Sequence, residues 1–134
     1  CLSEARLGLL PATIAPYVIR ALGEQAARRW FVTAERFSAR QAQAMGFVHE
    51  VVAADALDAK VAEIVAALVA NGPAAVRACK QLVKDMAGRP IDEALRAETA
   101  RRIADIRASA EGREGVQSFL NKRAPSWQAQ DKPQ

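Results

Sequence analysis

The chain has 134 residues and a formal net charge of +4, with 51% hydrophobic and 25% charged residues. Such a composition is typical of a folded globular chain and excludes a low-complexity or highly charged disordered one. Its Lys and Arg residues are interleaved with Asp and Glu rather than gathered into a basic block, so a nucleic-acid partner is not expected.

The two cysteines, Cys1 and Cys79, lie far apart and form no Cys-x-x-Cys or Cys/His pattern. Neither a metal site nor a disulfide framework is therefore predicted, and a reducing, cytoplasmic location fits best. No apolar run approaches the ~18 residues that a membrane span needs, so no membrane partner is expected. The apolar start without Met is typical of a chain that begins inside a longer structured protein.

The first third of the chain is predicted to form short helices. Pro11 suits the first turn of a helix over residues 12–22, because a missing N–H costs nothing there, and Gly23 is a natural stop. A second helix is expected over residues 24–32. The break between the two should lie at the glycine.

A capping box and a short strand are predicted next. Ser38 and Gln41 have the S-x-x-Q spacing in which each side chain bonds a free backbone N–H of the other, and Gly46 ends that helix. Residues 47–52 are rich in β-branched and apolar side chains, which indicates a single strand. His49, the sole histidine, lies in this strand and is interpreted as structural.

The second half of the chain is predicted to be a series of helices separated by breaks. Apolar side chains recur at helical spacing, which places Cys79 on a core-facing stripe, and Glu98 and Arg102 have the spacing of a surface ion pair. The expected elements are a helix that Asp55 caps and Asn71-Gly72 ends, a helix from Pro73 to a break at 88–90, a helix over 91–110, a last helix over 114–122 and a polar tail after Pro125.

Four motifs, in their order and spacing, resemble the enoyl-CoA hydratase/isomerase, or crotonase, family. They are Glu4-x3-Gly8-x2-Pro11; Thr33 followed by the run from Phe37 to Ala42 and by Gly46-Phe47-Val48 with Val51-Val52; Pro73-Ala74-Ala75-Val76 with Lys80; and the run from Glu114-Gly115-Val116 to Pro125. The resemblance covers essentially the whole chain. Because family members are about twice as long, it implies a C-terminal half, with most of the family's β-β-α spiral upstream of Cys1.

The resemblance implies a mainly α fold class: a C-terminal fragment of the crotonase fold, which is α/β overall, with one or two short strands and a C-terminal helical trimerisation region. Residues 1–72 would then end the catalytic core. Residues 73–124 would form the helical oligomerisation region, and residues 125–134 would be a polar tail. The implied assembly is a homotrimer or a dimer of trimers.

The chemistry that the resemblance implies is enoyl-CoA hydration, the syn addition of water to the double bond of an α,β-unsaturated acyl-CoA. Glu4 matches a carboxylate that acts as general acid and base beside a second glutamate. Ala12 would offer its backbone N–H to the water at a helix N-terminus, and Phe119 and Lys122 would contact the CoA of a neighbouring subunit. CoA is part of the substrate, so no separate cofactor is expected.

Several alternatives stay open. The second glutamate and the two backbone oxyanion donors would lie upstream of Cys1, so the isolated chain is expected to be inactive. An enoyl-CoA isomerase needs only the carboxylate at Glu4, and the chain could also be a non-catalytic helical oligomerisation module. Without the family resemblance, Glu4 would be a solvated side chain, Phe119 a core residue and Lys122 a surface charge.

The sequence departs from the family's common pattern at two places. Residues 11–17 are Pro-Ala-Thr-Ile-Ala-Pro-Tyr, where many members have a glycine-rich segment beside the acyl pocket. This version resembles hydratases that act on branched or carboxylated acyl groups, such as methylglutaconyl-CoA or isohexenylglutaconyl-CoA. Ala34 follows Thr33 where glycine is usual, and no consequence of this change follows from the sequence.

Overall fold

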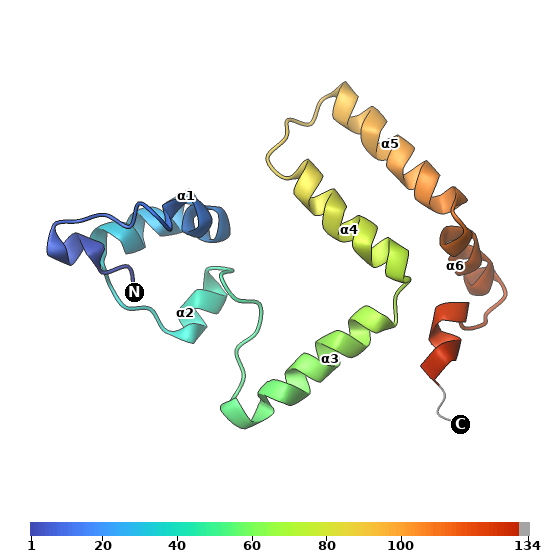
Figure 1. Cartoon of the computed structure of the whole chain (residues 1–134), viewed down its shortest axis with the longest axis horizontal. Coiled ribbons are helices and arrows are strands. Elements are labelled where there is room, and N and C mark those ends of the chain that lie inside the picture. The colour runs from blue at the N-terminus through green and yellow to red at the C-terminus, as the bar shows by residue number, and fades with distance from the viewer. Residues whose placement is uncertain (132–134) are drawn as a thin grey trace. The chain divides into compact units, whose positions relative to one another are not determined.

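The computed structural model describes residues 1–131, with side chains through Gln128. The chain divides into two compact units, Cys1–Leu57 and the residues from Asp58 onward (Figure 1). Every regular element among the described residues is a helix, which confirms the predicted mainly α fold class. The predicted division at residue 72 follows the family resemblance and stays a prediction.

Six α-helices and three short 3₁₀ helices make up the described part of the chain. No single helix there is long and apolar enough to cross a membrane, although Ala54–Val69 and Pro73–Met86 reach that length and composition as a pair bent by 104°. In chain order the helices are η1 (Glu4–Leu7), α1 (Ala15–Thr33), α2 (Ala39–Ala44), η2 (Ala54–Ala56), α3 (Leu57–Val69), α4 (Pro73–Met86), α5 (Glu93–Ala108), α6 (Ala110–Leu120) and η3 (Ser126–Asp131).

A break at Gly23 divides α1 into two helical stretches. This residue has φ 79° and ψ 162°, outside the helical region, which confirms the predicted stop between two helices. The first stretch begins at Ala15 rather than at the predicted residue 12. Pro16, not Pro11, lies in its first turn, so the helix begins one proline later than expected.

The core of the first unit forms around Trp30. Its side chain is 5% exposed, and its ring centroid lies 5.1 Å from that of Phe37. The Trp30 indole N–H donates to Met45 Sδ at 2.7 Å, and the guanidinium of Arg29 lies 4.7 Å from the centre of the ring. The other buried residues of this unit are Leu2, Pro11, Leu22, Ala27, Ala34 and Ala42.

The predicted capping box of α2 is confirmed. Ser38 Oγ accepts from the Gln41 N–H at 3.2 Å, and Gln41 Oε1 accepts from the Ser38 N–H at 2.9 Å. Gly46 follows with φ 75°. The predicted N-cap at Asp55 is wrong, because Asp55 lies inside η2, which begins after Ala53 and continues directly into α3.

The predicted strand over residues 47–52 is wrong, and no strand occurs anywhere in residues 1–131. A strand needs a neighbouring strand to satisfy its backbone groups, and none lies beside this segment. Instead, the Phe47 N–H donates to the Ala42 carbonyl at 2.9 Å, and the Gln43 side chain donates to the carbonyl of His49 at 3.1 Å. The segment is a turn and an irregular connection held by α2, and the His49 side chain is exposed.

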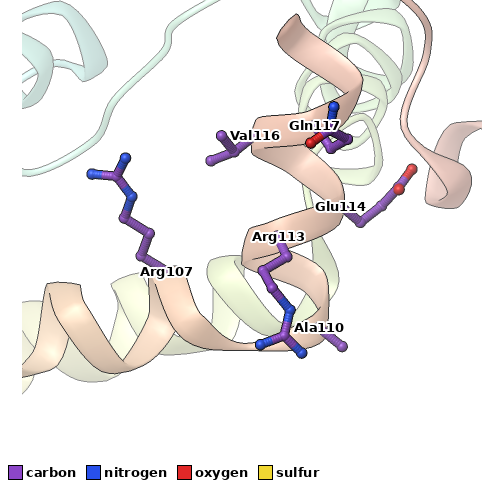
Figure 2. A pocket seen from close by; sticks show the side chains of 6 residues that line it. All are labelled: Arg107, Ala110, Arg113, Glu114, Val116 and Gln117. Atoms are coloured by element: carbon purple, nitrogen blue, oxygen red, sulfur yellow. The ribbon is translucent and has the colours of Figure 1, made fainter. Parts of the chain in front are cut away.

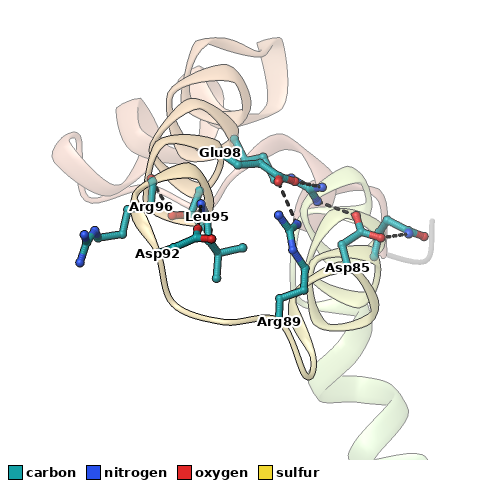
Figure 3. A network of polar contacts seen from close by, with 9 residues as sticks. Asp85, Arg89, Asp92, Leu95, Arg96 and Glu98 are labelled. Carbon is teal, nitrogen blue, oxygen red and sulfur yellow. Dashed lines mark hydrogen bonds and ion pairs between the residues drawn. The ribbon is translucent and has the colours of Figure 1, made fainter.

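In the second unit, α4 and α5 lie side by side and run in opposite directions (Figure 1). Arg102 on α5 donates to Asp85 at 2.7 Å and to Glu98 at 2.5 Å, and Arg89 donates to Glu98 at 2.9 Å (Figure 3). The Arg102 guanidinium lowers the pKa of Asp85, and Arg89 followed by Arg102 lowers the pKa of Glu98. The predicted Glu98–Arg102 pair is thus confirmed as part of a network that joins two helices.

Ser109 separates α5 from α6. Its hydroxyl accepts from the Gly112 N–H at 3.0 Å, so α6 begins at Ala110 rather than at the predicted residue 114. After α6, residues 126–131 form η3 where a polar tail is predicted from residue 125. Residues 132–134 of that tail lie outside the described part of the chain.

Glu114 anchors η3 to α6. Its carboxylate accepts from the Arg123 guanidinium at 2.6 and 2.8 Å and from the Ser126 N–H at 2.9 Å. These bonds, from Arg123 first and Ser126 second, lower the pKa of Glu114 from the ordinary value of 4.5 to about 2. The carboxylate therefore stays charged, and the anchor intact, in moderately acidic solution.

We expect this anchor to weaken in strong acid. Because the pKa of Glu114 is lower in the folded state, its bonds stabilise the fold fully above pH 4.5, and this contribution is lost as the pH falls from 4.5 to about 2. A carboxyl-carbon NMR titration should give a midpoint near 2 for Glu114, and Arg123→Ala should raise it. A wild-type midpoint at 4.5 would contradict the anchor.

Candidate functional site

Glu4 begins η1 in a tight turn of the first unit. Its carbonyl accepts from the Leu9 N–H at 3.0 Å, and the Gly8 N–H donates to the Ala5 carbonyl at 3.2 Å. Gly8 has φ 70°, a left-handed conformation that favours glycine, and this explains the Glu-x3-Gly spacing of the motif. Pro11 follows as a buried residue, so both ends of the turn are fixed.

The Glu4 side chain is half-buried, and one of its carboxylate oxygens is buried without a hydrogen-bond partner. Its Oε2 is buried and has no hydrogen-bond partner, and no other buried side-chain nitrogen or oxygen in the described residues lacks one. An orphaned buried acceptor costs about 1–3 kcal/mol, and such groups are the exception in folded proteins. Glu4 therefore keeps an acceptor oxygen that no described residue uses.

Ala34 holds the Glu4 segment against the end of α1. Its carbonyl accepts from the Arg6 guanidinium at 2.7 Å and from the Cys1 thiol at 3.4 Å, and its side chain is 1% exposed. Ala34 has φ 49°, a left-handed conformation, which gives a physical reason for the glycine that is usual here. No sequence motif indicates the bond from Arg6 to the Ala34 carbonyl.

Ala12 lies in the connection between η1 and α1 rather than at a helix N-terminus. Its N–H donates to the Leu10 carbonyl at 2.9 Å, and the helix begins at Ala15. The predicted helix start is therefore wrong at this residue. A water bound to the Ala12 N–H would share that donor with Leu10, and the role of Ala12 in substrate binding stays a prediction.

Phe119 and Lys122 lie in the second unit, at the end of α6. Phe119 is 82% exposed, and Lys122 is exposed with φ 52°. The Arg123 N–H donates to the Ser118 carbonyl at 3.0 Å and the Lys122 N–H to the Phe119 carbonyl at 3.1 Å, the two bonds of a Schellman motif. Lys122 thus occupies the position of that motif where glycine is usual. The alternative prediction, that Phe119 is a core residue, is wrong for this chain because the side chain is exposed.

We expect Lys122→Gly to stabilise the chain by about 1 kcal/mol, because a left-handed conformation costs a non-glycine residue roughly that much. Lys122→Ala keeps a Cβ at the same φ and should give no such gain. Urea unfolding of the two variants measures the difference. Equal stabilities for the glycine and alanine variants would contradict the strain at this position.

The hollow at the junction of α5 and α6 contains none of the predicted site residues. Its volume is about 530 Å³, and the side chains of Arg107 and Arg113 extend from it in different directions (Figure 2).

A second, more apolar hollow of about 540 Å³ lies between α4 and α5. Cys79 lines this hollow and is exposed, so the prediction that it is a core residue is wrong. Among the described residues, no group of three or more metal-ligating side chains could hold a metal ion.

A match to known proteins covers both units. Residues 1–130 match the family model described as enoyl-CoA hydratase/isomerase. The chain belongs to the enoyl-CoA hydratase/isomerase family. Because the match extends from the first unit through the second, it includes all four predicted site residues of the family: Glu4, Ala12, Phe119 and Lys122.

Three similar proteins show what share of a relative's length this chain covers. An enoyl-CoA hydratase structure from Shewanella pealeana is 44% identical, with a TM-score of 0.83 over 95% of this chain and 47% of that chain. One from Mycobacterium smegmatis is 34% identical, with a TM-score of 0.85 over 96% and 49%. Mevalonyl-coenzyme A hydratase sidH of Aspergillus fumigatus is 34% identical over 84% of this chain and 42% of its own length. The chain spans about half the length of such relatives.

Proposed function

We propose that this chain supplies the acid–base carboxylate, Glu4, of an enoyl-CoA hydratase. The reaction is the syn addition of water to the double bond of an α,β-unsaturated acyl-CoA. The observation that carries the proposal is the buried Oε2 of Glu4, which accepts no hydrogen bond from any described residue. Such a carboxylate can hold a water, remove its proton and deliver a proton to C2 of the acyl group.

The rest of the proposed site requires groups that match no residue of this chain. A second carboxylate would share the water, and two backbone N–H groups would stabilise the enolate oxygen, with a factor of about 10² to 10³ in rate for each such donor. We therefore propose hydratase activity for a full-length protein that carries this chain. CoA would enter as part of the substrate, without a separate cofactor, and the cytoplasmic location stays a prediction.

Hydration assays on the isolated chain test whether its site is incomplete. With crotonyl-CoA or methylglutaconyl-CoA, turnover is expected from the full-length protein and not from the isolated chain. Turnover by the isolated chain at a rate near that of the full-length protein would overturn the proposal of an incomplete site.

Phe119 and Lys122 are proposed to contact the CoA of a neighbouring subunit in a homotrimer or a dimer of trimers. Their exposure at the end of α6 supports this role, since an ammonium group suits phosphate as a point charge. In the full-length protein, Lys122→Gly should raise KM for the CoA thioester and leave kcat unchanged, the pattern of lost uniform binding. An unchanged KM would remove Lys122 from the proposed CoA site.

The substrate is proposed to carry a branched or carboxylated acyl group, as in methylglutaconyl-CoA or isohexenylglutaconyl-CoA. Residues 11–17 support this, because they lack the glycine-rich sequence found beside the acyl pocket in many family members. A kcat/KM for methylglutaconyl-CoA well above that for crotonyl-CoA is the expected result. The reverse order would assign the protein to straight-chain substrates.

An isomerase of the same family is the nearest alternative. A single carboxylate with one unpartnered oxygen is also sufficient to move a proton between C2 and C4 of an enoyl-CoA, which is double-bond migration. Product analysis separates the two activities. A hydratase converts a 2-enoyl-CoA to a 3-hydroxyacyl-CoA, whereas an isomerase converts a 3-enoyl-CoA to the 2-enoyl isomer without adding water.

A non-catalytic oligomerisation module is the second alternative. Large apolar side chains stay exposed on α5 and α6, including Ile103 at 63%, Val116 at 42% and Phe119 at 82%. Contact between copies of the chain would cover such faces. Light scattering measures the oligomeric state of the chain. A monomer at all concentrations would exclude the oligomerisation module. A stable trimer, together with no hydratase activity in the full-length protein, would favour the module over the hydratase.

A further inference from the structure

The corner between α3 and α4 leaves backbone groups of both helices unsatisfied within those helices. α3 ends at Val69 and α4 begins at Pro73, with a bend of 104° between the helical segments. Helix ends leave carbonyls free at one end and N–H groups free at the other. Gly72, the N-cap residue of α4, has no side chain that could accept from the free N–H groups of α4. Asn71 in the corner bonds the Ala67 and Leu68 carbonyls of α3. The segment 111–128 bonds the free N–H groups of α4 and the Ala70 carbonyl that follows α3.

Glu111 on α6 caps the N-terminus of α4. Its Oε2 accepts from the Ala74 N–H at 2.9 Å, and its Oε1 accepts from the Ala75 N–H at 2.7 Å. A carboxylate is favoured there by the helix dipole as well as by the two bonds. A Cβ on Gly72 would lie 2.5 Å from Glu111 Oε1, so glycine at this position is what allows the carboxylate to approach.

Trp127 and Gln128 on η3 donate hydrogen bonds to the α3 side of the same corner. The Trp127 indole N–H and the Gln128 amide both donate to the Ala70 carbonyl, at 3.3 and 2.7 Å. The Trp127 ring lies close to α6, since a Cβ on Gly115 would be 3.1 Å from its Cη2. Glu114 ties η3 back to α6 through Ser126, so the two sets of bonds belong to one folded segment.

Packing within the described chain does little to fix α3. Its apolar residues Val61, Ile64 and Leu68 are 50%, 44% and 50% exposed, whereas buried side chains would be needed to set a crossing angle. The hydrogen bonds at the corner therefore do more than side-chain packing to direct α3 relative to α4.

We infer that the segment 111–128 is a clamp that sets the angle between α3 and α4 by bonding both sides of their corner. Opening either side frees α3 to change direction against the α4–α5 pair. The clamp acts as a unit, because Glu111 and Trp127 are joined through α6 and through the Glu114 anchor to η3.

Amide hydrogen exchange in the 134-residue chain tests the first side of the clamp. Glu111→Ala should speed exchange at Ala74 and Ala75 by about five- to tenfold, the typical effect of a lost helix cap. Glu111→Gln keeps one acceptor oxygen and should give a smaller increase in a folded chain. Glu63→Ala removes an exposed carboxylate from α3 and should leave both amides unchanged.

The second side decides between a clamp and a local cap. Trp127→Phe combined with Gln128→Ala should also speed exchange at Ala74 and Ala75, although neither side chain bonds those amides. Pulsed EPR between labels at residues 62 and 84, with Cys1 and Cys79 replaced by Ser, should give one narrow distance that broadens in both sets of variants. Faster exchange with Glu111→Ala but not with the Trp127 and Gln128 changes, or unchanged EPR distances, would overturn the clamp.

Discussion

Replacing Glu4 by Gln in a full-length protein that carries this chain is expected to lower kcat for hydration by about 10²- to 10⁴-fold. The substitution keeps the shape of the side chain and removes its ability to take up and return a proton. The unfolding midpoint should stay the same or rise, because Glu4 Oε2 makes no hydrogen bond that the change would remove. Loss of activity without loss of stability is the signature of a group positioned for chemistry.

Glu24→Gln is the matched control for this prediction. Glu24 lies in the same unit, and its side chain is 79% exposed and paired with Arg28. Steady-state hydration kinetics should therefore not distinguish this variant from the wild-type protein. A comparable loss of kcat in both variants, or none in Glu4→Gln, would remove Glu4 from the chemistry.

Trp30→Ala is expected to destabilise the first unit by about 3–5 kcal/mol, the usual cost of truncating a buried aromatic side chain. Trp30 is 5% exposed and packs on Phe37, and its indole N–H is bonded to Met45. The loss of this core should also release the turn that holds Glu4. Urea unfolding followed by circular dichroism, with amide exchange to localise the change, measures the effect.

Phe119→Ala provides the contrast. The side chain is 82% exposed, so its truncation should change the free energy of unfolding by no more than about 0.5 kcal/mol in the isolated chain. In the full-length protein the same variant should raise KM for the CoA thioester. If Trp30→Ala costs no more stability than Phe119→Ala, the described core of the first unit is not what holds that unit together.

Sequence patterns predicted the features of this chain that depend on neighbouring residues. The Ser38–Gln41 capping box, the break at Gly23 and the start of α4 at Pro73 each result from local backbone chemistry, and the structure confirms all three. The start of α6 after Ser109 is also a local signal, since the Ser109 hydroxyl accepts from the Gly112 N–H, but the last helix was predicted to begin only at residue 114.

Features that depend on distant partners were not predictable in the same way. The residues 47–52 have the composition of a strand, yet a strand forms only where another strand lies beside it. The cap that Glu111 provides for α4 joins residues that are 36 and 37 positions apart, beyond the reach of a capping motif. The same limit applies to Ala34, whose left-handed backbone and bond to Arg6 appear only in the folded unit.

The candidate site was predicted through motifs rather than through physical chemistry. The spacing of Glu4 to Gly8 and Pro11 resembles the family motif, and the match over residues 1–130 confirms the family. The unpartnered burial of its Oε2 is independent of that resemblance, since no pattern in the sequence indicates it. The two observations together make Glu4 the strongest candidate for chemistry in this chain.

The proton at C2 of the hydrated product tests the proposed role of Glu4 most directly. In deuterated water, the full-length protein should exchange one C2 proton of a 3-hydroxyacyl-CoA, because Glu4 removes and returns it in each reversal of hydration. Glu4→Gln should slow this exchange by about 10²-fold or more while CoA thioester binding is unchanged. Exchange at the wild-type rate in Glu4→Gln would contradict the assignment of Glu4 as the acid–base carboxylate.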